Sequence, residues 1–152
     1  MKLEVINPFV KAAIDVLHSE LGCEVSRGKL SMESGLVTEH DINALVGLTG
    51  EVQGTVLYGL SMVTGQAMIS LMMGQPCLQF DSLAQSGISE LGNVITGSAS
   101  RELSKNGLNC NITPPTLFFG AECNINTGDV PRITIPLITS CGEIKIHIAL
   151  KS

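Results

Sequence analysis

The side chains best suited to chemistry in this chain are a carboxylate and an amide, Glu90 and Asn93, three residues apart. On a helix this spacing places both on one side, one turn apart. A carboxylate pairs with cations, and an amide both donates and accepts hydrogen bonds without titrating. The pattern Glu-x-x-Asn also occurs often by chance on exposed helices, so the two residues alone do not assign a function.

The stretch from Asp81 to Lys105 predicts one long helix that carries this pair. Asp81 can cap the free N–H groups at its start, and Asn106-Gly107 is a common helix stop. When residues are placed at steps of about 100°, one apolar arc marks the side that we expect to be buried. That arc consists of Ala84, Ile88, Leu91, Ile95, Ala99 and Leu103.

The opposite arc of this helix is unusual, because it holds small polar residues instead of the Lys, Glu and Arg of an ordinary solvated face. It consists of Ser86, Ser89, Glu90, Asn93, Thr96, Gly97, Ser100 and Ser104. Small residues let another backbone come close. A glycine inside a helix costs about 1 kcal/mol relative to alanine, so we expect Gly92 to pack closely on a neighbour and Gly97 to leave clearance for a partner.

The rest of the chain alternates between helical and strand patterns. Asn7-Pro8 predicts a helix start and Gly22 its end, whereas Ser61 and Gly74 bound a second helix over residues 62–73. The β-rich runs are residues 23–30, 44–50, 52–60, 116–121, 132–140 and 143–150, of which the second and third form a predicted hairpin.

The resulting order, α-β-β-β-α-α-β-β-β, predicts an α+β fold in a single domain over residues 1–152. We expect three helices and one mixed or antiparallel sheet of about six strands. Pro136 lacks a ladder donor, so its strand is expected to be an edge strand or bulged. Alternation in the last strand turns Lys145 and His147 outward.

Composition narrows the class of protein. The chain has 152 residues, of which 44% are hydrophobic, and its mean hydropathy of +0.33 predicts a packed globular fold. Its net charge is −5, and the absence of a basic cluster argues against nucleic acid as a partner. The uncharged stretch 52–80 is interrupted by glycine and glutamine, so we do not expect it to span a membrane.

The five cysteines predict neither a disulfide framework nor a zinc site, because their number is odd and no two have CxxC spacing. Buried thiols in a reducing cytoplasm are the better interpretation, and the N-terminus lacks the apolar core of a signal peptide. The three histidines are scattered, so we expect solvated or edge-strand positions for His18, His40 and His147.

In combination, several motifs resemble the CheC/CheX/FliY phosphatases of bacterial chemotaxis. They are Ala44-Leu-Val-Gly-Leu-Thr-Gly, Gly54-Thr-Val-Leu-Tyr-Gly-Leu, Met72-Met73-Gly74, Ser86-x-x-x-Glu90-x-x-Asn93 and a downstream proline. The resemblance covers about residues 44–120 in the same element order. The CheC branch usually carries two copies of the Glu/Asn helix. This short chain has one, so it resembles the CheX branch, which works as a homodimer.

The resemblance implies an enzyme that hydrolyses the aspartyl phosphate of a CheY-like response regulator in the cytoplasm. Asn93 matches the amide that orients the attacking water, and Glu90 matches the carboxylate that engages the regulator's lysine. Ser86 matches the motif's Asp/Ser position, and Pro115 is the best match to its proline. Ser89, Gly97 and Ser100, on the same arc, are expected to contact the partner.

The implied chemistry needs no cofactor of the chain's own, and we expect Mg²⁺ on the partner receiver domain. A non-catalytic chemotaxis or flagellar binding module that docks through the same helix face remains an alternative. So does a small dimer that buries this face in its own interface. Phosphate release from a phosphorylated receiver separates the first alternative from catalysis.

Overall fold

The computed structural model describes residues 3–37, 40–120, 124–126 and 130–151. Its helices are α1 (Leu3–Leu21), α2 (Met62–Met73) and α3 (Ser82–Lys105). Its strands are β1 (Val25–Arg27), β2 (Ser31–Glu33), β3 (Leu36–Val37), β4 (Ile42–Gly50), β5 (Gly54–Leu60), β6 (Cys110–Ile112), β7 (Thr116–Phe119), β8 (Ile125–Asn126), β9 (Arg132–Thr139) and β10 (Gly142–Leu150).

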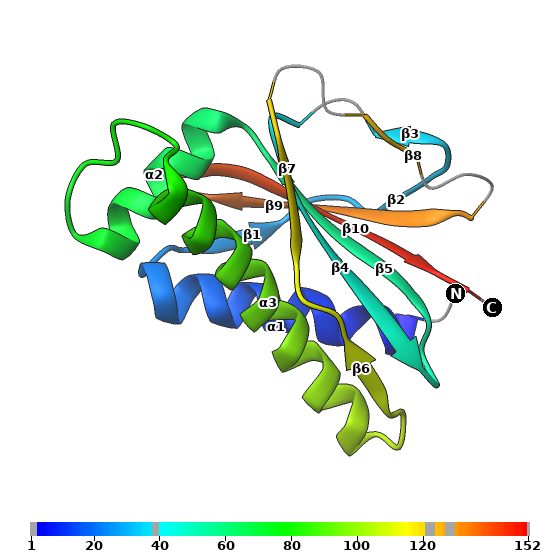
Figure 1. Ribbon diagram of the computed structural model, residues 1–152. Coiled ribbons are helices and arrows are strands. Elements are labelled where there is room, and N and C mark those ends of the chain that lie inside the picture. Colours follow the sequence, from blue (N-terminus) through cyan, green and yellow to red (C-terminus); the bar gives the residue numbers. More distant parts are fainter. Residues whose placement is uncertain (1–2, 38–39, 121–123, 127–129, 152) are drawn as a thin grey trace.

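The main sheet is antiparallel at every described pairing and follows the order β1-β9-β10-β5-β4-β6. Two short strands share each outer position: β1 and β2 both pair with β9, and β6 and β7 both pair with β4. Among the described residues the main sheet therefore has eight strands in six positions, more than the six or so strands predicted, whereas the predicted α+β fold with three helices is confirmed. A separate ribbon of β3 and β8 lies at one end of it (Figure 1).

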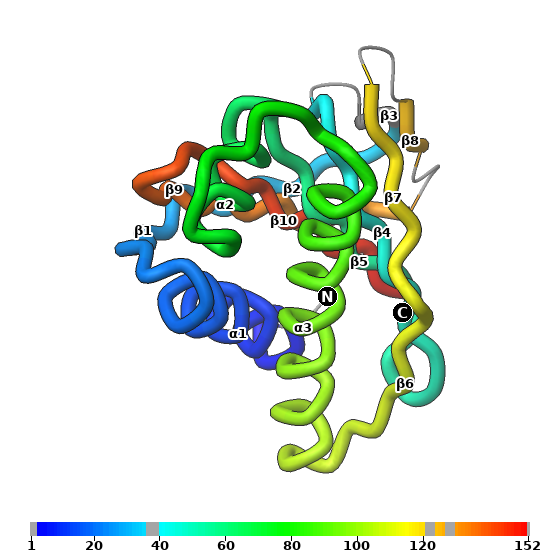
Figure 2. Tube along the Cα trace, turned by 60° about the vertical axis from the view of Figure 1, so that its left-hand side comes forward, coloured from blue at the N-terminus to red at the C-terminus, as the bar shows by residue number. Residues whose placement is uncertain are grey.

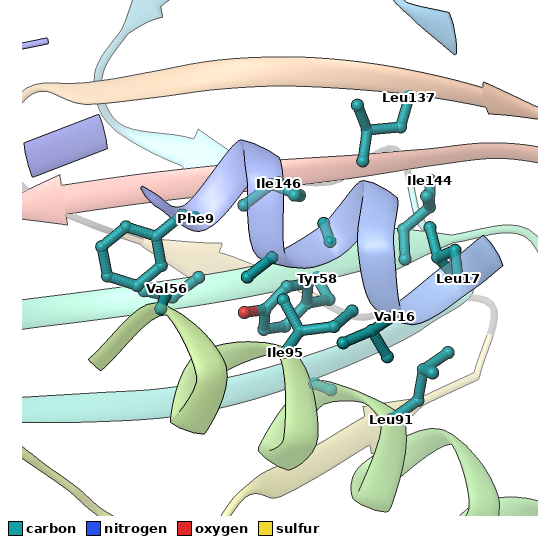
Figure 3. Packing of buried hydrophobic residues seen from close by; sticks show 14 of the residues in the cluster. Phe9, Val16, Leu17, Val56, Tyr58, Leu91, Ile95, Leu137, Ile144 and Ile146 are labelled. Atoms are coloured by element: carbon teal, nitrogen blue, oxygen red, sulfur yellow. The ribbon is translucent and has the colours of Figure 1, made fainter. Parts of the chain in front are cut away.

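Helices α1 and α3 lie side by side on one face of the sheet (Figure 2), and the hydrophobic core fills the space between the two layers. Figure 3 shows side chains from the strands meeting the apolar sides of both helices. The strand residues include Tyr58 and Ile146, and the helix residues include Phe9, Leu17 and Ile95. Each fully buried large aliphatic side chain contributes about 1.5–3 kcal/mol. This packing fixes the direction of α3 and so decides which of its sides faces outward.

The predicted bounds of α2 and α3 are confirmed. The Asp81 side chain accepts a hydrogen bond from the Ala84 N–H at 3.0 Å, and the apolar arc of α3 is buried. The Ser61 hydroxyl caps α2 in the same way, and Gly74 ends it in the left-handed conformation with φ of 70°.

The predicted start of the first helix is wrong, because α1 already includes Leu3 and continues through Pro8. A proline inside a helix removes one N–H donor. Ile6, Pro8 and Phe9 are all buried, so packing on the core offsets that loss. The predicted end is confirmed, since Gly22 has φ of 68°.

The expectation of an edge strand at Pro136 is also wrong, because β9 lies between β10 and the pair β1 and β2. Its register with β10 runs through Pro136 without a bulge. On the other side, β1 pairs with residues 137–139 and β2 with residues 132–134, so the proline faces the break between them. There the Gly28 N–H donates to the Pro136 carbonyl at 2.8 Å.

Two histidine predictions need correction, whereas His18 is exposed as expected. His147 is buried on the sheet face away from the helices, where its Nε2 lies 3.1 Å from Nε2 of the buried His40. Alternation does turn His147 away from the helical layer, but neighbouring segments cover that face. A cavity of about 260 Å³ on this face is lined in part by His147, Leu57 and β8.

The described cysteines Cys23, Cys77, Cys110 and Cys141 are free thiols, and Cys123 lies outside the described residues. The Sγ atoms of Cys23 and Cys141 are 3.7 Å apart. Within the described part of the chain, no helix is both long enough and apolar enough to cross a membrane.

Candidate functional site

Helix α3 presents Glu90 and Asn93 on one side. The two residues point about 60° apart around the helix axis and lie about 4.5 Å apart along it. Glu90 is exposed and Asn93 is half-buried. Among the described residues, neither side chain has a hydrogen-bond or ion-pair partner. Both polar groups are therefore available to an outside molecule.

A groove lies beside Glu90, and its lining comes from α3 and from the chain segment that forms β6 and β7. Figure 2 shows this segment running alongside α3. This segment is held alongside the helix because it pairs with β4 and because the Ser100 hydroxyl donates to the Cys110 carbonyl at 3.1 Å. The groove has a volume of about 460 Å³, and its lining residues are Ser82, Gln85, Ser86, Ser89, Glu90, Pro115 and Leu117.

The groove brings together four of the predicted site residues: Ser86, Ser89, Glu90 and Pro115. Pro115 comes from the segment between β6 and β7, so residues from two distant parts of the sequence meet here. Asn93 lies one turn further along α3. Ser100 lies beyond the groove, where its hydroxyl already bonds to β6.

The three glycines inside α3 have different surroundings. A Cβ on Gly87 would lie 2.5 Å from Cδ1 of Ile69, and one on Gly92 would lie 3.3 Å from Cδ2 of Tyr58. Close packing on a neighbour therefore explains Gly87 and Gly92, as predicted for the latter. A Cβ on Gly97 would meet nothing nearer than 3.7 Å, so the described chain itself does not require glycine there.

A buried hydrogen-bond relay holds the inner side of α3 against the sheet. It includes Thr96, whose predicted place on the polar outer arc is wrong because its side chain is fully buried. The Tyr58 hydroxyl lies 2.7 Å from Oγ1 of Thr96, which donates to the Gly92 carbonyl at 2.7 Å. Burial raises the pKa of Tyr58, so its hydroxyl stays protonated. Because Thr96 already donates to Gly92, Tyr58 is the donor to Thr96. The relay ties the turn of α3 that contains Asn93, from Gly92 to Thr96, to strand β5.

The sequence interpretation missed three groove residues: Ser82, Gln85 and Leu117. A signal for Leu117 was present in the sequence, because Leu117 follows the predicted site residue Pro115 by only two positions. Gln85 is positioned by its own hydrogen bond, from Nε2 to the Phe80 carbonyl at 3.0 Å. That contact depends on the path of the connector before α3, which carries no local motif.

The chemistry of the site is that of one carboxylate and one amide beside small hydroxyls. In the described ranges, no three His, Cys, Asp or Glu side chains gather as metal ligands. An amide can hold a water through both a donor and an acceptor, and a carboxylate can bind a partner's cation. The arrangement suits a reaction centre that is completed by another protein.

Comparisons with known proteins agree on one family. Residues 42–137 match the model of the family described as "Chemotaxis phosphatase CheX". The chain is 30% identical, over its whole length and 99% of the relative's, to the CheY-P phosphatase CheX of Thermotoga maritima.

Solved structures show the same fold. A chemotaxis protein CheX from Desulfovibrio desulfuricans is 25% identical with a TM-score of 0.89, and the match covers 97% of this chain and 99% of that one. CheX in a CheX–CheY–BeF3–Mg²⁺ complex from Borrelia burgdorferi is 25% identical with a TM-score of 0.86, covering 99% and 100%. Together with the family match over most of the sheet and all of α3, these likenesses make the chain a member of the CheX family of chemotaxis phosphatases.

Proposed function

We propose that this chain hydrolyses the aspartyl phosphate of a CheY-like response regulator, with Asn93 orienting the attacking water and Glu90 engaging a lysine of the regulator. One observation carries the proposal. In a chain that is 30% identical throughout to a CheY-P phosphatase, Glu90 and Asn93 lie on one side of an outward-facing helix, with no side-chain partner among the described residues, and Glu90 lines a groove.

The reaction explains why so few groups are needed. An aspartyl phosphate is an activated acyl phosphate, so no covalent nucleophile on this chain is required. Water attacks the phosphorus, the bond from phosphorus to the aspartyl oxygen breaks, and inorganic phosphate and the free carboxylate are released. Holding the water in line with the bond that breaks is the main contribution that the phosphatase must supply.

Asn93 suits this task because its amide oxygen accepts from the water while its N–H₂ group donates to it or to the phosphoryl oxygens. Its half-buried position restricts its rotamers. Glu90 is more exposed and can reach a lysine on the partner in a charge-assisted pair, which would set the distance of the amide from the phosphorus. We assign Mg²⁺ to the receiver domain, as part of the substrate.

The test is phosphate release from a phosphorylated CheY-type receiver domain, together with the Kd for the same receiver loaded with beryllofluoride and Mg²⁺. Asn93→Ala should lower kcat by roughly 100-fold or more and leave Kd largely unchanged, because one positioning group is lost. Glu90→Ala should lower kcat and raise Kd. Asn111→Ala, at an exposed asparagine on β6, and Glu102→Ala, at another α3 glutamate, are the matched controls.

Two outcomes would contradict the proposal in different ways. If the wild-type chain binds the receiver and never speeds its dephosphorylation, the protein is a binding module that docks through α3. If Asn93→Ala retains full kcat, the chain is a phosphatase whose water is held elsewhere.

We also propose that the chain works in the cytoplasm as a homodimer, in which a second copy covers an exposed sheet edge. Light scattering after gel filtration measures the molar mass and therefore the oligomeric state. A monomer at micromolar concentration would contradict it. A dimer that hides Glu90 would favour a structural role for this face of α3.

A further inference from the structure

Two exposed apolar side chains lie near Glu90, within two helical turns of it and on the flank away from the groove. Leu83 is 63% exposed and precedes Glu90 by seven residues. It therefore points within about 20° of the same direction, about 10 Å away along α3. Met72 of α2 is 37% exposed. Gly87 lies between Leu83 and Glu90 along α3. The Cε atom of Met72 is 4.0 Å from the position that a Cβ on Gly87 would take.

The chain segments on both sides of these residues are almost free of charge. Between Glu51 and Arg101 the only charged residues are Asp81, which caps α3, and Glu90. The segment 106–120, which forms the other wall of the groove, has none. Solvated helix faces usually carry many charges. Apolar side chains with methionine, few charges and small polar neighbours are typical of the centre of a protein interface.

An interface of ordinary size is large enough that a receiver bound over Glu90 would also reach Leu83 and Met72. A standard complex buries roughly 800 Å² on each protein, equivalent to a patch of about 16 Å radius. A receiver domain centred on Glu90 therefore extends past Leu83, which is about 10 Å from it. A standard-sized interface centred on Glu90 would therefore include these side chains.

We propose that Leu83 and Met72 form an apolar anchor for the receiver domain. The inference rests on the proposed function and adds a division of labour to it. Apolar contacts remote from the phosphorus are the same in the ground state and the transition state, so they lower Kd and KM without changing kcat. Glu90 and Asn93 then act on a receiver that the anchor has already placed.

The test uses variants that keep the helices and remove the apolar surface. Leu83→Gln and Met72→Gln introduce a good helix former of similar length at exposed positions. Val63→Gln is the matched control: Val63 is 76% exposed on the same helix as Met72. It points to the opposite side of α2, about 13 Å away along the axis.

Steady-state hydrolysis of a phosphorylated CheY-type receiver gives KM and kcat, and titration with the beryllofluoride-loaded receiver gives Kd. We expect each anchor variant to raise KM and Kd by about 10-fold, the loss of roughly 1.4 kcal/mol of binding. Values of kcat should stay within about two-fold, and Val63→Gln should match the wild type in all three.

The results separate the anchor from the activity. Unchanged KM and Kd in both anchor variants of an active phosphatase would overturn the anchor and leave the proposed function standing. A wild-type chain that binds without turnover would overturn catalysis, while Kd of the variants would still support or overturn the anchor. A wild-type chain that neither binds nor hydrolyses would overturn both.

Discussion

The Tyr58 hydroxyl and the Thr96 hydroxyl meet 2.7 Å apart on the buried side of the helix whose outer side carries Glu90 and Asn93. Thr96 donates onward to the Gly92 carbonyl, so it must accept from Tyr58. Both side chains are at most 2% exposed. This contact joins strand β5 to the middle of α3 and ties the outward-facing pair to the rigid centre of the sheet.

Because the hydrogen bonds run from Tyr58 to Thr96 to Gly92, removing the Thr96 hydroxyl should cost more free energy of unfolding than removing the Tyr58 hydroxyl. Thr96→Val leaves the buried Tyr58 hydroxyl without an acceptor, so we expect a loss of about 1–3 kcal/mol in the free energy of unfolding. Tyr58→Phe removes only the donor and leaves Thr96 bonded to Gly92, so about 0.5–1.5 kcal/mol is expected. Urea denaturation of both variants checks the order. Equal losses, or a larger one for Tyr58→Phe, would show that the relay runs differently.

A second prediction concerns alkaline pH. Burial, reinforced by the hydrogen bond to Cys23, raises the pKa of Cys141 from 9.0 to about 11, and burial also raises the pKa of Tyr58 above its usual 10.0. Above about pH 9 the unfolded chain loses protons that the folded chain keeps, so stability must fall as pH rises.

The urea midpoint measured between about pH 8 and pH 10.5 checks this. We expect it to fall through this range in the wild type and to fall less steeply in Cys141→Ala. Cys77→Ala, which removes a thiol from the connector between α2 and α3, is the control and should follow the wild type. A midpoint that does not change with pH in the wild type would contradict the shifts.

Local patterns in the sequence were sufficient to predict the bounds of α2 and α3. Asp81 and Ser61 cap their helices through bonds to residues three positions away, and Gly74 ends α2 by its own conformation. The apolar arc of α3 was confirmed because a helix this long packs one whole side on the sheet. The helix start at Pro8 was predicted wrongly because buried residues on both sides of Pro8 stabilise α1 there, and local sequence patterns do not report burial.

Strand neighbours were harder to predict because pairing joins residues far apart in the sequence. Pro136 indicates a missing hydrogen-bond donor, but no nearby residue predicts that the gap between β1 and β2 lies opposite it. Likewise, His147 pairs with His40 across 107 positions. In the candidate site, Glu90 and Asn93 were selected from their spacing together with the unusual polar arc around them and the family resemblance. The groove wall that contains Leu117 depends on the pairing of β7 with β4.

The glycine pair Gly87 and Gly97 gives a third prediction, because the chain needs only one of them. Gly97→Ala meets no close atom and should stabilise the fold by up to about 1 kcal/mol through helix propensity. If Gly97 provides clearance for a receiver, the same change should raise Kd for the beryllofluoride-loaded receiver.

Gly87→Ala is the matched comparison on the same helix. Its Cβ would meet Cδ1 of Ile69 at 2.5 Å, so Ile69 must shift and the gain in stability should be smaller or absent. Urea denaturation and receiver titration measure both effects. If Gly97→Ala is stabilising and binds the receiver as the wild type does, the clearance assigned to Gly97 is not needed.

The last prediction asks whether Asn93 acts by its position or only by its chemistry. Asn93→Gln keeps the amide but moves it outward by one methylene, roughly 1.5 Å. Since misplacement by about 1 Å can cost 100-fold in rate, we expect kcat to fall nearly as far as in Asn93→Ala, with Kd unchanged. Single-turnover phosphate release under saturating receiver measures this. Near-normal kcat in Asn93→Gln would mean that the water is placed by the receiver and that the amide only contacts it. The relay from Tyr58 holds this turn of α3 in place, so only the half-buried side chain can accommodate the extra length. A raised Kd in Asn93→Gln would therefore mean that this side chain helps to dock the partner.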